Sequence, residues 1–158
     1  NGSGKSTLLR IILGLTSPSK GEVEYCKPNL QISYLGHKNA IKHYLTPMQN
    51  LELIFRSSAL SEAIKWMHIL GLNKVQDELT ANLSFGQQKK LALIRVFASE
   101  SDLIILDEPF VGLDDASRDL LNGFLQKQLA SDASLILTSH IEPNILCSEL
   151  VLSGDTDD

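Results

Sequence analysis

The stretch Asn1-Gly2-Ser3-Gly4-Lys5-Ser6-Thr7 opens the chain and leads directly into the apolar run 8–13. Its two glycines allow the backbone to curl so that successive N–H groups point at one anion. A helix that begins near Lys5 adds the positive end of its dipole at the same place. The spacing matches the last part of a loop G-x-x-x-x-G-K-[ST], in which the lysine reaches the β- and γ-phosphates and the next hydroxyl, here Ser6, binds Mg²⁺. The sequence therefore predicts that residues 1–7 bind the phosphates of a nucleotide.

Composition limits the remaining function classes. The 158 residues are 43% hydrophobic and 21% charged, which is ordinary for one globular domain with its own core. The net charge of −5 provides no basic field, so we do not expect nucleic acid as a partner. Cys26 and Cys147 stand in no metal or redox spacing. No apolar run approaches the length of a membrane span, so any membrane role must come through partner chains.

The chain begins inside a motif and without an initiator methionine. A phosphate-binding loop normally follows a buried strand, and neither that strand nor the first glycine of the loop precedes Asn1. We therefore expect the sequence to be a fragment of a longer protein. Its missing start should carry N-terminal strands, the first glycine and the groups that contact the base.

Alternating strands and helices predict an α/β fold. The continuous apolar run Leu103-Ile104-Ile105-Leu106 is typical of a strand buried on both faces of a parallel sheet. Such strands, joined by helices, favour a phosphate-loop core with right-handed crossovers. The other strands are expected at 22–25, 30–35, 135–137 and 150–152, and core helices at 6–15 and 115–129.

Between residues 38 and 81 the pattern is helical instead. Thr46-Pro47 is a capping residue followed by proline, which predicts a helix over 48–57. Ser61 is expected to cap a second helix that Gly71 closes, and Ser84-x-x-Gln87 has capping-box spacing for a helix that ends near residue 99. We therefore expect one domain over 1–158: a phosphate-loop core of residues 1–37 and 88–158, with an inserted helical subdomain at 38–87.

Two acidic residues follow the buried run directly. Side chains at the carboxyl end of such a strand face the crevice where ligands bind, and the phosphate-binding loop should border the same crevice. Asp107 is then placed to hold Mg²⁺ with Ser6, and Glu108 to orient and deprotonate an attacking water. His140 ends the next strand and could hydrogen-bond the γ-phosphate and that water, although a lone histidine is as often structural.

A second anion site is suggested at Leu83-Ser84-Phe85-Gly86-Gln87, where a helix begins with a serine hydroxyl and a glycine. One chain does not need two γ-phosphate sites. The second site therefore suggests a nucleotide held between two chains, and the alternative is simply a well-capped helix.

In this order the motifs resemble those of ABC transporter ATPases. Residues 1–7 resemble the Walker A loop, and 83–88 resemble the signature motif, usually L-S-G-G-Q. Residues 103–109 resemble Walker B with its catalytic glutamate. Gly112-Leu113-Asp114 is similar to the D-loop, and His140 to the switch histidine.

The resemblance implies an ATPase that works as a pair. Two such chains, here a homodimer, would close head to tail around two ATP molecules with Mg²⁺. Ser84, Phe85, Gly86 and Gln87 of one chain would meet the ATP bound by Lys5 of the other, and Asp114 would link the two sites. Integral membrane permease subunits would be the further partners. The chain would lie peripherally at the cytoplasmic face of the inner (plasma) membrane, or at an organellar equivalent.

Two residues depart from the family pattern. Phe85 replaces the first signature glycine, and His37 stands at the Q-loop position, where glutamine is usual. The surroundings of His37, Tyr34-Leu35-Gly36-His37-Lys38 followed by Ile41-Lys42, Leu45-Thr46 and Asn50-Leu51, resemble the ATPase of the cytochrome c maturation exporter, often described as a haem exporter.

Three alternatives remain at this point. The first is an ABC transporter ATPase for another cargo, which only the His37 region opposes. The second is a soluble ABC-type ATPase that acts mechanically on ribosomes or DNA; the acidic charge and the lack of a coiled-coil insertion oppose it. The third is a degenerate domain that binds ATP without turnover. Glu108 and His140 oppose that reading, whereas Phe85 keeps it open.

Overall fold

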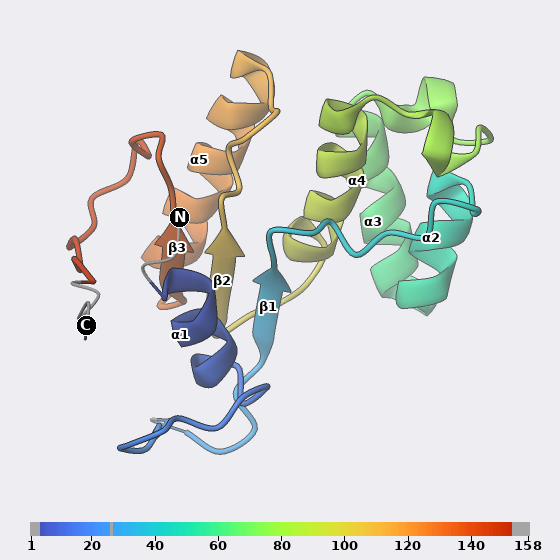
Figure 1. The fold of residues 1–158 in the computed structure, drawn as a ribbon. Helices are drawn as coiled ribbons and strands as arrows, with labels where there is room; N and C mark the ends of the chain where they lie inside the picture. The colour runs from blue at the N-terminus through green and yellow to red at the C-terminus, as the bar shows by residue number, and fades with distance from the viewer. Residues whose placement is uncertain (1–3, 26, 153–158) are drawn as a thin grey trace, which may run out of the picture.

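The structure, a computed structural model, describes residues 4–25 and 27–152, so Asn1, Gly2, Ser3 and Cys26 lie outside the described residues. A parallel sheet lies at its centre, with strand order β1-β2-β3 (Figure 1). The strands are β1 (Ile32–Leu35), β2 (Leu103–Asp107) and β3 (Ser134–Thr138). Every residue of β2 is buried, which confirms the central, doubly covered strand predicted from its apolar run.

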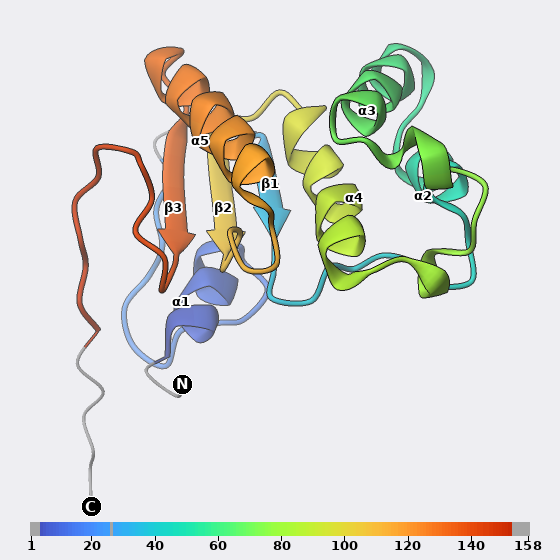
Figure 2. The same cartoon turned by 90° about the horizontal axis from the view of Figure 1, so that it is seen from above.

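Helices cover the two faces of this sheet (Figure 2). On one face, Leu9 of α1 (Lys5–Ile12) packs with Leu103 and Ile105 of β2. On the other face, Ile104 and Leu106 belong to a cluster with residues of α4 (Phe85–Phe97) and α5 (Asp115–Ala130). Successive side chains of a strand point to opposite faces, and this alternation divides the core into its two halves.

A helical block lies beside the β1 edge of the sheet (Figure 1). It contains α2 (Pro47–Ile54), α3 (Ser57–Ile69), the short 3-10 helices Leu72–Val75 and Thr80–Asn82, and it leads into α4. The predicted capping box at Ser84 is present, since its hydroxyl accepts from the Gln87 N–H at 3.2 Å. Thr46 caps α2 as predicted and also forms a capping box, in which its hydroxyl accepts from the Gln49 N–H at 3.2 Å.

The helical block and the sheet share one hydrophobic core. Leu35 and Leu106 of the sheet belong to the same buried cluster as Leu51 of α2, Met67 of α3 and Ile94 of α4. An aromatic group continues this cluster toward α5. Its members are Trp66 and Phe97, stacked with 4.5 Å between ring centroids, and Phe124, edge-on to both.

Asn50 fixes the loop that enters the block. The side chain is buried, and its amide donates to the carbonyls of Lys42 (3.0 Å) and Thr46 (3.0 Å) and to the hydroxyl of Thr80 (3.2 Å). In return its oxygen accepts the Lys42 N–H at 2.8 Å. One buried amide therefore holds the backbone of the loop at Lys42 and Thr46 and ties it to the side chain of Thr80.

Three expectations of local structure were wrong. Residues 22–25 and 150–152 form no strand; within the described chain neither segment finds a neighbouring strand to pair with, and Leu150 and Val151 are exposed. Alternation and apolarity predict a face but not a partner. Ser61 does not cap α3, which begins a turn earlier at Ser57, because the apolar positions that pack inward extend back to Ala59 and Leu60.

None of the helices in the part of the chain that the structure describes is both long enough and apolar enough to cross a membrane.

Candidate nucleotide-binding and hydrolysis site

Helix α1 starts at the carboxyl edge of the sheet. Gly4, at φ 77°, takes the left-handed conformation that turns the chain into the helix, and no side chain of the described residues caps the first N–H groups of α1. These N–H groups and the helix dipole therefore remain available to an anion. Lys5, Ser6 and Thr7 border a cavity of about 410 Å³ at this point.

The same cavity gathers predicted site residues from distant parts of the sequence. They come from the start of α1, the loop after β1, the start of α4, the end of β2 and the loop after β3. The predicted residues that line it are Gly4, Lys5, Ser6, Thr7, His37, Phe85, Asp107, Glu108 and His140. Gln87 and Asp114 do not line it, and Ser84 caps α4 beside it.

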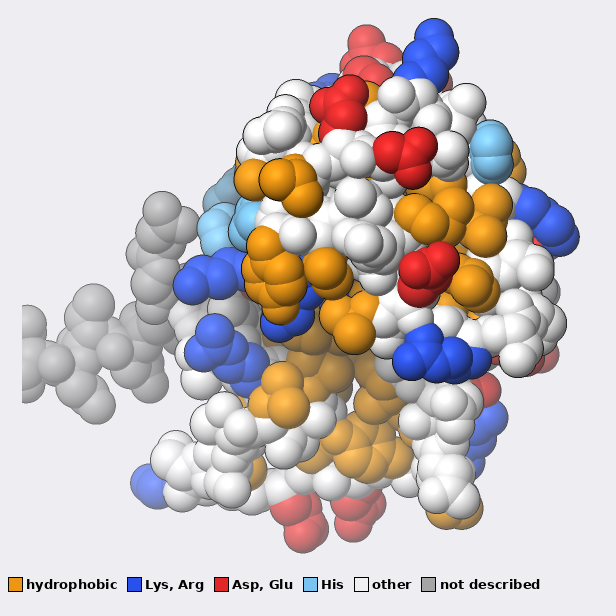
Figure 3. Space-filling model, turned by 90° about the vertical axis from the view of Figure 1, so that its right-hand side faces the viewer, with side chains coloured by type: hydrophobic (Ala, Val, Ile, Leu, Met, Phe, Trp, Pro, Cys, Tyr) orange, Lys and Arg blue, Asp and Glu red, His pale blue; other side chains and the backbone are white. Residues whose placement is uncertain are grey.

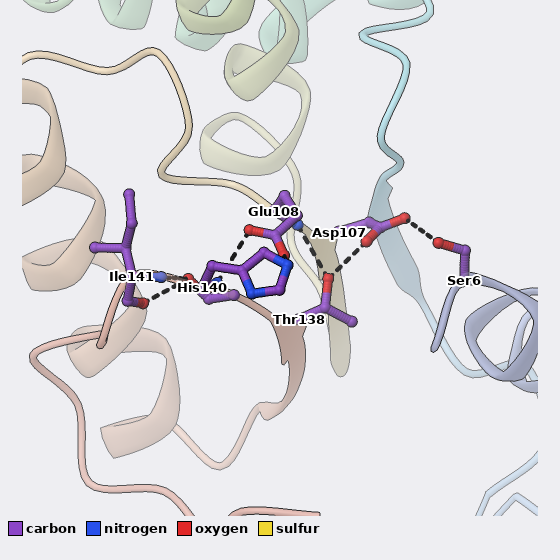
Figure 4. A network of polar contacts seen from close by, with 7 residues as sticks. Ser6, Asp107, Glu108, Thr138, His140 and Ile141 are labelled. Atoms are coloured by element: carbon purple, nitrogen blue, oxygen red, sulfur yellow. Dashed lines mark hydrogen bonds and ion pairs between the residues drawn. The ribbon is translucent and has the colours of Figure 1, made fainter. Parts of the chain in front are cut away.

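Asp107 is held by two hydroxyl groups (Figure 4). Ser6 Oγ donates to Asp107 Oδ2 at 2.9 Å, and Thr138 Oγ1 donates to Asp107 Oδ1 at 2.6 Å. The carboxylate is only 4% exposed. The hydroxyl of Ser6 and the carboxylate of Asp107 are oxygen ligands of the kind that Mg²⁺ prefers. Among the described residues no three acidic, histidine or cysteine side chains gather in a group that could hold a metal ion by themselves.

Glu108 has an unusual backbone. Its φ of 50° is left-handed, a conformation that costs a non-glycine residue roughly 1–2 kcal/mol. Its N–H is held by the carbonyl and the hydroxyl of Thr138, both at 3.1 Å. Its side chain, 14% exposed, accepts from the His140 N–H at 3.2 Å, and His140 Nε2 lies 3.5 Å from Oε1 (Figure 4). The fold thus maintains local strain to hold a carboxylate against a histidine at the cavity.

Two residues at this site were missed by the sequence reasoning. Thr138 is the register partner of Asp107 and donates to its carboxylate. The sequence feature that could have identified it is a hydroxyl side chain at the end of the strand predicted over 135–137. Lys89 of α4 lines the cavity while only 2% exposed. Burial lowers the pKa of Lys89, whereas the charges of Asp107 and Glu108 raise it. Its signal was a lysine four positions after Phe85, on the same face of the predicted helix.

The signature-like segment packs against the loop after β2. A Cβ on Gly86 would lie 2.7 Å from the carbonyl oxygen of Gly112, and one on Gly112 would lie 2.4 Å from the ring of Phe85. The ring of Phe85 therefore fills the space over Gly112 of its own chain, although the residue is still 58% exposed. The two glycines bring the start of α4 and the D-loop into direct backbone contact.

Asp114 strengthens this contact. Its Oδ2 pairs with Lys90 of α4 at 2.7 Å, and its Oδ1 accepts the N–H of Ser117 at 3.0 Å, which caps α5. The hydrogen bond from Lys90, followed by those from Ser117, holds the pKa of Asp114 well below its usual range. One side chain thus joins the signature-like helix to the helix after the D-loop.

This combination of sheet, phosphate-facing helix and paired carboxylates is matched by a family model. The model of the ABC transporter family covers residues 1–111, and the chain therefore belongs to that family. Within the family it is similar to two proteins named "Cytochrome c biogenesis ATP-binding export protein CcmA". One, from Idiomarina loihiensis, is 38% identical over 170 residues (99% of this chain, 73% of that protein). The other, from Dechloromonas aromatica, is 36% identical over 158 residues (92% and 78%).

A solved structure agrees with this assignment. The chain matches the "Structure of ATP binding subunit of ABC transporter" with a TM-score of 0.78 and 26% identity, over 89% of this chain and 65% of that one. The chain thus spans just under two thirds of that structure and about three quarters of the relatives above. The predicted α/β fold of the ABC type and the resemblance to the cytochrome c maturation ATPases are confirmed.

Proposed function

We propose that this chain is the ATP-binding and ATP-hydrolysing subunit of an exporter that serves cytochrome c biogenesis. The observation that carries the proposal is the cavity at which Lys5 and Ser6 of α1 meet Asp107, the last residue of β2, and Glu108, which follows it. The names of the relatives support the export role. Haem delivery is the specific cargo that we propose for it.

The residues have separable tasks in hydrolysis. Lys5 and the N–H groups at the start of α1 bind the phosphates, and Ser6 and Asp107 hold Mg²⁺. When bound, Mg²⁺ neutralises charge that develops on the phosphate oxygens. Glu108 orients a water molecule and takes its proton as the water oxygen attacks the γ-phosphorus. The bond from that phosphorus to the bridging oxygen breaks, and ADP and orthophosphate leave.

His140 and Thr138 position this base. The main-chain N–H of His140 holds one oxygen of the Glu108 carboxylate, and Thr138 holds the strained Glu108 backbone. We assign His140 to the γ-phosphate side of the water, because its ring lies beside Glu108 at the cavity and is 70% exposed.

We further propose that two copies of the chain enclose the nucleotides. The hydroxyl of Ser84 accepts a hydrogen bond from its own helix and keeps its proton free to donate to a phosphate of the other copy. Gly86, Gln87 and the ring of Phe85 stand at the same end of α4. Asp114 is linked to α4 through Lys90 and would couple the two nucleotide sites across the interface.

The catalytic assignment is tested by Glu108→Gln. The variant should bind ATP normally and lose turnover by about 10²–10⁴-fold, because a positioned base contributes that much. Glu142→Gln removes an exposed carboxylate two residues after His140 and serves as the matched control. Both variants are assayed by phosphate release and by ATP titration. Near-normal turnover of Glu108→Gln would show that Glu108 is not the base.

The helical block offers a surface for integral membrane subunits. It bears large hydrophobic side chains of which about half or more of the surface is exposed, namely Tyr44, Leu53, Ile54, Ile69 and Leu79. Figure 3, which views the side of the molecule where the block lies, shows hydrophobic side chains at the surface among charged ones. We propose that permease subunits dock here and hold the chain at the cytoplasmic face of a membrane.

Substitution of Leu53 tests this surface. Leu53→Asp should reduce co-purification of membrane subunits from detergent extracts and leave ATP binding intact. Leu150→Asp changes an exposed leucine outside the block and is the matched control. Equal recovery of membrane proteins with both variants would contradict the docking surface.

The cargo system is tested by identifying what co-purifies. Affinity purification from solubilised native membranes should recover two small polytopic proteins and cytochrome c maturation factors. An unrelated permease would retain the ATPase mechanism and refute the cytochrome c role. Ribosomal proteins without membrane proteins would favour a soluble mechanical ATPase instead.

A further inference from the structure

Lys89 is a buried cation that makes no direct ion pair with any described residue, although the charges of Asp107 and Glu108 act on it. It is 2% exposed, and its ammonium makes neither an ion pair nor a hydrogen bond within residues 4–25 and 27–152. By contrast Lys27, Lys65 and Lys90, all more exposed, each pair with a carboxylate. A buried ammonium group without a direct partner is costly, and a phosphate oxygen in the cavity would give Lys89 such a partner.

The anion must enter from the cavity. Lys89 lines the same cavity as Lys5, Ser6 and Glu108, four residues along α4 from Phe85, which also lines it. Residues four apart share one face of a helix. This face of α4 is therefore turned toward the chain's own nucleotide site, while Gly86 and Lys90 on another face contact the D-loop.

The charges of the cavity point to the same conclusion. Its lining residues in the described chain include two carboxylates, Asp107 and Glu108, and two lysines, Lys5 and Lys89. Without Lys89 the net charge of these side chains would be negative. A nucleoside triphosphate is also negative, even with a divalent cation bound, and it would have to bind beside these carboxylates. Lys89 supplies the charge that makes the cavity neutral before the ligand arrives.

We propose that Lys89 is a second phosphate-binding residue of this site, which contacts the terminal phosphate of a bound nucleoside triphosphate from the α4 side. Lys5 lies on α1, so the two lysines reach the cavity from different helices. Contact at the terminal phosphate predicts that Lys89 distinguishes a triphosphate from a diphosphate. The same chemistry would also hold free orthophosphate. This inference rests on the proposed binding of ATP.

The test measures nucleotide affinity by calorimetric titration of the full chain in the presence of magnesium. Lys89→Met should weaken ATP binding by about ten-fold or more, the effect of one lost hydrogen bond to a charged group, and weaken ADP binding by less than about two-fold. Lys89→Arg should keep most of the ATP preference. Lys65→Met, which removes an exposed lysine of α3, is the control for a lost charge elsewhere.

Each outcome decides a separate point. If wild type and Lys65→Met bind no ATP, the proposed function fails, and the role of Lys89 fails with it. If they bind ATP and Lys89→Met binds ATP within two-fold of wild type, or loses ATP and ADP equally, Lys89 does not contact the terminal phosphate. Unchanged ATP affinity with weakened competition by added orthophosphate would overturn the triphosphate contact and assign Lys89 to the released product. Should Lys89→Met not fold, Lys89→Gln carries the same comparison with a polar, uncharged side chain.

Discussion

Thr138 offers the sharpest test of how the site is built. Its hydroxyl donates to Asp107 at 2.6 Å and accepts the N–H of Glu108 at 3.1 Å, so one oxygen connects both of these residues. Thr138→Val keeps the shape of the side chain and removes both contacts. The Glu108 N–H retains the carbonyl of Thr138, whereas the buried carboxylate of Asp107 loses a donor.

The magnitude follows from these contacts. A hydrogen bond to a charged group contributes about 1.5–3 kcal/mol. The added methyl group returns up to about 0.8 kcal/mol by burial. We therefore expect the free energy of unfolding to fall by about 1–2 kcal/mol, which at a typical urea m-value of about 2 kcal/mol/M lowers the midpoint by roughly 0.5–1 M. ATP hydrolysis should fall as well, because Asp107 and Glu108 lose a shared support.

Thr138→Ser is the matched control. It keeps the hydroxyl and removes only a methyl group, so its urea midpoint should lie closer to wild type and its hydrolysis should persist. The assays are equilibrium urea unfolding and phosphate release at saturating ATP. The reasoning is refuted if the valine and serine variants lose the same stability and the same activity, since the hydroxyl would then be irrelevant.

Three further predictions concern contacts other than those of Asp107 and Glu108. Asp114→Asn keeps the cap of α5 but removes the charge, and the pKa of Asp114 is lowered in the folded protein, so the charge stabilises the fold above the ordinary carboxyl pKa of about 3.9 and this stabilisation is lost as the pH falls toward the folded pKa. The urea midpoint of the variant should therefore lie below that of the wild type at neutral pH, and the difference should shrink below about pH 4. Gly86→Ala gains about 1 kcal/mol of helix propensity, but it places a Cβ against the Gly112 carbonyl at a cost of about 1–3 kcal/mol. Thermal unfolding should therefore show a net loss of stability of up to about 2 kcal/mol, and a gain in stability would refute the close contact. Asn50→Ala leaves the Lys42 N–H without its acceptor and should lower the free energy of unfolding in urea by about 1–3 kcal/mol. An unchanged urea midpoint would show that this hydrogen bond does not stabilise the fold.

Local patterns predicted the elements whose causes are local. The capping boxes at Thr46 and Ser84 and the apolar run 103–106 define their helices and strand almost without reference to the rest of the chain. The predictions of strands at 22–25 and 150–152 were wrong because a strand also needs a neighbouring strand, which an alternating sequence pattern does not reveal. The prediction that Ser61 caps a helix was wrong for a related reason. Serine also occurs inside helices, and the packing of α3 decides where this helix begins.

The same division holds for the site. Asp107, Glu108 and His140 could be predicted because ends of neighbouring parallel strands meet at one edge. The role of Thr138 depends on strand register, which pairs it with Asp107. The contact of Phe85 with Gly112 depends on how α4 is placed against the loop after β2. Neither follows from residue spacing, because both are set by the packing of elements far apart in the chain.

The adjacency of β1 and β2 has a consequence for how this chain emerges during translation. The two strands are hydrogen-bonded neighbours, yet the whole of α2, α3 and α4 is synthesised between Leu35 and Leu103. At about 5–20 residues per second, β1 waits several seconds for its partner. Helices form within microseconds, so the helical block has time to organise first, while the edge of β1 stays unpaired and open to other nascent chains. Slow codons placed after β1 would lengthen that exposure, and slow codons placed after β2 would not.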